Sequence, residues 1–138
     1  MLVRAFRGAC VALLMALILL APAALADDLA DFHAAVGEAT DAYNQAMVTL
    51  STRGQAETAA AVHRLRASWQ AIGERFAGNR PAAFADDENF GTMFMQVDMS
   101  LIGVLLVIDL GNRDGARAAL TGVGETLAKL SARSIAPR

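Results

Sequence analysis

Cysteine and histidine are scarce in this 138-residue chain, which has one Cys and two His. A single cysteine, Cys10, cannot close a disulfide within the chain, supply a set of thiolates to zinc, or complete the CxxCH motif that attaches haem covalently. Basic residues are scattered along the sequence, and the formal net charge is −2. These features argue against nucleic acid and against an anionic membrane surface as partners.

Motifs for catalysis are missing as well. No Ser/His/Asp arrangement is readable, and Ser100 has no evident base. The ExxH pairs that di-iron bundles place on facing helices are absent from the sequence. We therefore expect a protein that is not an enzyme and that is stabilised by apolar packing.

The first 26 residues have the layout of a cleavable secretory signal peptide. Two arginines precede an unbroken apolar run at residues 11–20, and residues 24–26 (Ala-Leu-Ala) form a small-x-small cleavage site. The run is too short for a typical membrane span, although an uncleaved anchor is the alternative interpretation. We predict a signal peptide at residues 1–26, which removes Cys10, and an exported, periplasmic domain at residues 27–138.

Four stretches of that domain repeat apolar residues at spacings of three and four, which line one face of an α-helix. The expected helices cover residues 28–51, 55–76, 87–110 and 114–133. The one long connection, residues 77–88, contains the helix breakers Gly and Pro and ends in acidic residues that read as the start of the next helix. Short turns at residues 52–54 and 111–113 force antiparallel neighbours. The predicted fold is an all-α, antiparallel up-down-up-down four-helix bundle.

The third predicted helix is apolar around more than one face. One stripe consists of Phe90, Phe94, Val97, Leu101, Val104 and Ile108, and a second of Met95, Met99, Ile102 and Leu106. Facing the bundle uses only one stripe, so the other must cover something. We therefore expect a partner on this surface, and another periplasmic protein is one possible partner. The alternative is a third helix that is buried all round in a monomer.

Two carboxylates, Asp98 and Asp109, interrupt this apolar helix. A lone carboxylate is costly to bury without a partner. Asp98 is expected either to pair with an arginine of the second or fourth helix or to lie, like Asp109, at the edge of the buried surface.

The chain resembles a family of small periplasmic four-helix-bundle cytochromes, the soluble b-type cytochrome and cytochrome c′. The resemblance is carried by residues 27–33 (DDLADFH) and by the turn and helix start at residues 111–120 (GNRDGARAAL). It implies a cytochrome c′-like bundle and export. Because cytochrome c′-like proteins often dimerise through helices, it also implies a homodimer formed through the second apolar stripe of the third helix. By position, His33 stands where the b-type proteins have a haem-ligating methionine, and Ser131 where they have the ligating histidine. Residues 127–131 (LAKLS) replace the CxxCH of cytochrome c′, so the haem-binding signatures are missing.

His33 is nevertheless the centre of a candidate metal site. His63 is expected about 13 Å away along the bundle axis, too far to share a first-shell metal with it. The first and third helices start at the same end, which brings Met93 and Met95 level with His33, and Met95 and Met99 form an i, i+4 pair. Histidine with soft thioethers suits copper(I), or haem iron through His/Met ligation. The alternative is that these methionines fill the core and His33 is a surface residue.

Two functions follow from the sequence. The first is a binding or interaction protein without covalent haem. The second is a carrier of copper or of non-covalent haem, or an electron-transfer protein, whose ligands come from His33, Met93, Met95 and Met99.

Overall fold

The computed structural model describes residues 28–135, and this part of the chain is helical without any strand. A first helix covers residues 28–52, followed by α2 (Gln55–Phe76), the 3-10 helix η1 (Ala82–Phe84), α3 (Phe90–Asp109) and α4 (Arg113–Ser134). The predicted all-α four-helix fold is therefore confirmed. The signal peptide predicted at residues 1–26 lies outside the described residues.

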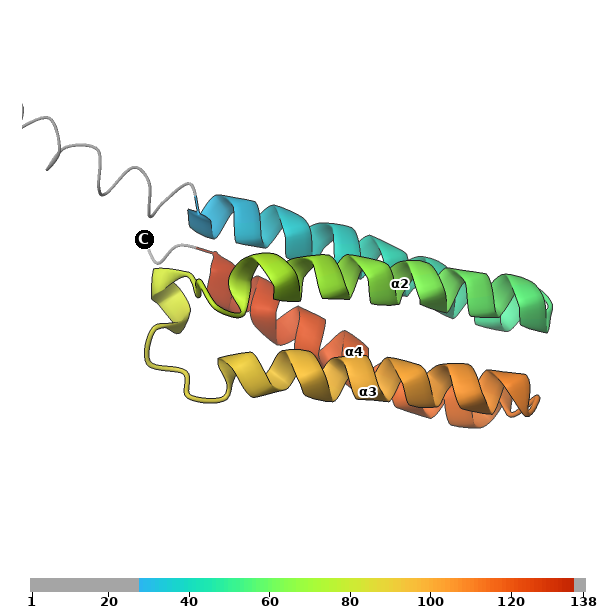
Figure 1. Cartoon of the computed structure of the whole chain (residues 1–138). Helices are drawn as coiled ribbons and strands as arrows, with labels where there is room; N and C mark the ends of the chain where they lie inside the picture. Colours follow the sequence, from blue (N-terminus) through green and yellow to red (C-terminus); the bar gives the residue numbers. More distant parts are fainter. Residues whose placement is uncertain (1–27, 136–138) are drawn as a thin grey trace, which may run out of the picture.

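The four long helices lie alongside one another (Figure 1). Both short turns lie at one end of the bundle, and the connection that contains η1 lies at the other. The third helix, α3, packs against both α2 and α4. It therefore occupies one corner of the bundle, where one side faces the interior and the other faces solvent.

The interior is built from one apolar stripe of each helix, as the spacing predicts. On α3 the buried residues are Phe90, Phe94, Val97, Leu101, Val104 and Ile108, which is the first of the two predicted stripes. Trp69 of α2 is 1% exposed, and its indole Nε1 donates a hydrogen bond of 3.0 Å to the backbone carbonyl of Phe94. This bond satisfies the one polar group of a large buried side chain.

Aromatic rings fill the interior at the η1 end. The ring centroid of Phe32 in the first helix lies 5.1 Å from those of Phe76 and Phe84 and 6.0 Å from that of Phe90. Phe84, which comes from η1, is fully buried. The long connection thus contributes a core residue that closes this end of the bundle.

The start of α3 corrects the prediction that residues 86–88 begin the helix, because α3 begins at Phe90. Asp87 lies in the preceding turn, where Oδ1 accepts a 3.0 Å bond from the backbone N–H of Asn89 and Oδ2 accepts a 2.7 Å bond from Arg133. The Arg133 guanidinium also lies 4.4 Å from the ring centroid of Phe84. These hydrogen bonds, that from Arg133 foremost, lower the pKa of Asp87. Asp87 anchors the connection to α4 and does not begin a helix.

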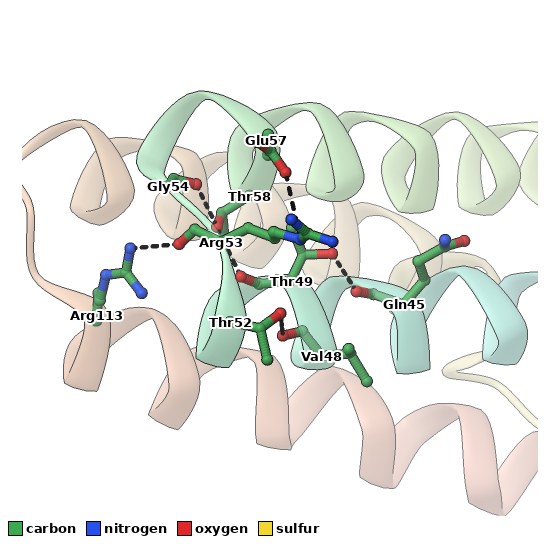
Figure 2. A network of polar contacts seen from close by, with 9 residues as sticks. All are labelled: Gln45, Val48, Thr49, Thr52, Arg53, Gly54, Glu57, Thr58 and Arg113. Atoms are coloured by element: carbon green, nitrogen blue, oxygen red, sulfur yellow. Dashed lines mark hydrogen bonds and ion pairs between the residues drawn. The ribbon is translucent and has the colours of Figure 1, made fainter.

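At the opposite end, the start of each even-numbered helix caps a neighbouring helix. Arg113, at the start of α4, donates a 2.8 Å bond to the carbonyl of Leu50 in the last turn of the first helix. It donates a second bond of 2.5 Å to the carbonyl of Arg53, just after that helix (Figure 2). Gln55, at the start of α2, donates a 2.6 Å bond to the carbonyl of Ile108 near the end of α3. Leu50 and Ile108 belong to the last turns of their helices, where carbonyls have no partner within the helix, and the carbonyl of Ile108 also accepts a 2.9 Å bond from the backbone N–H of Gly111. The two turns are thereby fastened to the rest of the bundle.

Candidate functional site

His33 is exposed on the first helix and held in place by α4. Its Nδ1 lies 2.5 Å from the hydroxyl of Ser134, and that hydroxyl donates a 2.9 Å bond to the carbonyl of Ser131. If the hydroxyl donates to Ser131, the tautomer of His33 that donates from Nδ1 would leave the Nε2 lone pair available. Metal-ligating histidines are oriented by the same kind of bond. His33 is therefore a competent single ligand.

The methionines predicted to join His33 point in different directions. Met93 is half-buried against the core, whereas Met95 and Met99 are 64% and 62% exposed. Met93 and Met95 are two residues apart, which is about 200° around a helix. The four predicted ligands therefore do not converge on one point within a single chain. Metal binding stays a prediction, and its remaining structural basis is the exposed pair Met95 and Met99.

No other metal-binding constellation accompanies them. The described residues contain no group of three or more His, Cys, Asp or Glu that could hold a metal ion. His63 is exposed beside a shallow hollow between α2 and α3 that Leu105 and Asp109 also line. A haem between the helices at the η1 end would have to displace the packed rings of Phe32, Phe84 and Phe90, each of which is fully buried.

The largest unexplained feature is the solvent side of α3, which we call the outer face of α3. It consists of Met95, Met99, Ile102, Leu106 and Leu110. Of the six large apolar residues exposed in the described chain, four belong to it, with exposed fractions of 61–79%. The second stripe predicted from the sequence therefore lies at the surface. The alternative prediction, a third helix buried all round, is wrong for this chain by itself.

The carboxylate next to this face is neutralised. Asp98 accepts hydrogen bonds of 2.8 Å from Nε and 3.1 Å from Nη2 of Arg66, and a third of 3.2 Å from Gln70. The predicted pairing with an arginine of the second helix is confirmed. The hydrogen bond to Asp98 raises the pKa of Arg66. The fork of the guanidinium matches both carboxylate oxygens, so the charge of Asp98 is compensated beside the apolar stripe.

By length and composition, α3 would also be able to cross a membrane. An 18-residue window within Phe90–Asp109 has a mean hydropathy of 1.8, and 28% of that window is buried. One such helix is weak evidence for a membrane span, because core helices of soluble proteins pass the same test.

Comparison with known proteins identifies no family for this chain. A scan against protein-family models, a search of the curated proteins and a search of the solved structures found no match. The features of the described structure that bear on function are the outer face of α3 and the few polar groups around it.

Proposed function

We propose that this chain is a non-enzymatic interaction protein that works in the periplasm and binds its partner through the outer face of α3. One observation carries the proposal: Met95, Met99, Leu106 and Leu110 lie on one side of one helix with most of their surface in water. Contiguous apolar surface of this kind marks interaction sites. Removing apolar surface from water favours association, against the cost of ordering the two partners.

The composition of α3 favours a protein partner over a lipid surface. Helices that lie on membranes carry Lys and Arg along their polar face, which attract anionic lipids. The sequence of α3 has neither residue, and its central carboxylate, Asp98, is already paired with Arg66. An apolar surface on a partner protein can cover the exposed side chains of α3, and this contact requires no positive charge on the helix.

The periplasmic location rests on the sequence. The signal-peptide layout of residues 1–26 and the resemblance to periplasmic bundle cytochromes both support export. Disulfides cannot stabilise a chain with one cysteine, and the large aromatic and aliphatic core is consistent with a fold that does not need them.

Chemical cross-linking in intact cells tests the proposal. Leu106→Arg places a charge on the outer face of α3, and Val48→Arg is the matched control, because Val48 of the first helix is 62% exposed against 61% for Leu106. We expect a cross-linked adduct that Leu106→Arg abolishes and Val48→Arg keeps. An adduct that survives Leu106→Arg, or no adduct at all, would contradict the proposal.

The second candidate function is a copper or non-covalent haem carrier. It is favoured by the i, i+4 thioethers of Met95 and Met99, which are exposed, and by the exposed imidazole of His33 as a further single ligand. Visible absorption and metal analysis of protein purified from its native periplasm test it. A Soret band, or stoichiometric copper that His33→Ala removes, would favour the carrier. A colourless, metal-free protein would refute it.

A further inference from the structure

We infer that the partner of the outer face of α3 is a second copy of this chain, bound with the two α3 helices antiparallel about a two-fold axis between Met99 and Ile102. The inference rests on the proposed function, because it names the occupant of the same face. It adds the direction and the register of the pairing, both of which are testable.

The spacing of the face is that of a helix seam. Thr92, Met95, Met99, Ile102, Leu106 and Asp109 follow one another at intervals of 3, 4, 3, 4 and 3 residues. This average of about 3.5 residues is the period at which two helices pack side by side over several turns. The buried stripe of α3 has the same alternation and packs against α2 and α4. The outer stripe is a second seam of the same kind, and within its own chain no helix covers it in the described structure.

The seam is self-complementary when two copies run in opposite directions. A two-fold axis between Met99 and Ile102 sets Met99 against the partner's Ile102 and Met95 against the partner's Leu106. All four central positions are then apolar against apolar. Such an interface uses the same patch twice, which is the ordinary construction of a homodimer.

The helix dipole favours the antiparallel direction, although Asp86 and Glu88 also lie next to the amino end of α3. Asp109 is exposed at the carboxyl end of α3, where a carboxylate is unfavourable for the helix dipole. The amino end of α3 has no acidic residue in its first turn, and Asn89 makes no side-chain cap there. In the antiparallel pair, Asp109 lies opposite the partner's Thr92, at that uncapped amino end. A parallel pair would instead bring Asp109 against the same carboxylate of the other copy.

The size of the face predicts a dimer that dissociates on dilution. From Thr92 to Asp109 the seam is about 26 Å long, on a helix about 10 Å in diameter. The hollow between α2 and α3, lined by Ala56, Ala59 and His63, widens the surface on one side. The contact area of a strip about 26 Å by 10 Å is below the roughly 800 Å² per partner of a standard interface. Interfaces at the small end of the range are weak and transient.

Cysteine cross-linking in the purified, naturally processed protein tests direction and register together. Met95→Cys and Leu106→Cys are made in separate chains, and the unsubstituted protein controls for Cys10. In the antiparallel pair, the two Met95 positions are about 16 Å apart along the axis. A disulfide requires Cα atoms within about 7 Å. The two variants should therefore cross-link when mixed, and each should cross-link far less by itself.

The outcomes are distinct. A mixed Met95→Cys/Leu106→Cys disulfide dimer, absent when Val48→Cys replaces either partner, supports the inference. Met95→Cys chains that cross-link with themselves as readily would overturn the antiparallel register. A protein that sediments as a monomer at every concentration would overturn the homodimer. In that last case, a cellular adduct of another mass that still requires Leu106 would leave the proposed function standing, and the absence of any adduct would remove both.

Discussion

Replacing Arg113 with alanine should loosen the turn end of the bundle by a predictable amount. The guanidinium donates to two backbone carbonyls, those of Leu50 and Arg53, at 2.8 and 2.5 Å. A hydrogen bond from a charged donor contributes about 1.5–3 kcal/mol when it is well shielded, and less for an exposed side chain such as this one. We therefore expect Arg113→Ala to lower the free energy of unfolding by about 1–2 kcal/mol.

Arg117→Ala is the matched control, because Arg117 is also a basic residue near the start of α4 but makes one exposed bond, 3.0 Å long, to the hydroxyl of Ser51. Its expected cost is about 0.5 kcal/mol or less. The assay is urea unfolding followed by the fluorescence of Trp69, the only tryptophan of the chain. A Tm shift of about 4–8 °C per kcal/mol gives a second measure of the same change.

Arg113→Lys should restore only part of the stability, because an ammonium group cannot reach two carbonyls as a fork does. The reasoning is refuted if Arg113→Ala costs no more than Arg117→Ala. It is also refuted if lysine restores the full stability, since a charge near the turn would then be sufficient.

Three further predictions concern the core, the connection and α3. Phe84→Ala should cost about 3–5 kcal/mol of unfolding free energy, measured by urea unfolding, because Phe84 is fully buried although it lies in a connection; a cost below about 1 kcal/mol would contradict this packing. Asp87→Asn should destabilise the protein at neutral pH. Because the folded-state pKa of Asp87 lies below its ordinary 3.8, its contribution is present above that pH and lost as the pH falls through the lower folded value. The urea midpoints of the wild-type protein and the Asp87→Asn variant should therefore converge in acid, and a constant gap would contradict the assignment. Leu101→Ala should cost about 2–5 kcal/mol and Leu106→Ala about 1 kcal/mol or less in dilute protein, and equal costs would show that the two stripes of α3 are wrongly assigned.

The helices were predictable because their information is local. Apolar spacing placed both ends of α2 and the whole buried stripe of α3. The start of α3 was missed because Asp87 reads as an acidic first turn, whereas in the fold it binds Arg133, 46 residues away. Phe84 was missed for a related reason: a 3-10 helix of three residues has no periodicity to detect.

Contacts between distant residues were less accessible to sequence reasoning. A glycine such as Gly124 lowers the helix propensity of α4, yet the ring of Tyr43 lies where a Cβ would stand, so the glycine makes room for it. Asp98 was expected to find an arginine, but only the packing of α2 on α3 selects Arg66. The hydrogen bond between His33 and Ser134 joins residues 101 apart in the sequence, and no local sequence pattern predicts it.

The most direct test of the outer face of α3 is the solvent exposure of its methionine methyl groups in solution. Carbon-13 methyl NMR of the processed protein with a soluble paramagnetic probe reads Met95 and Met99 separately, with half-buried Met47 as an internal reference. At high protein concentration we predict that both methyl groups are protected from the probe. Leu106→Arg should expose them to the degree seen in the single chain, 64% and 62%, and leave Met47 unchanged. Full exposure of Met95 and Met99 in the wild-type protein at every concentration would contradict an interface on this face.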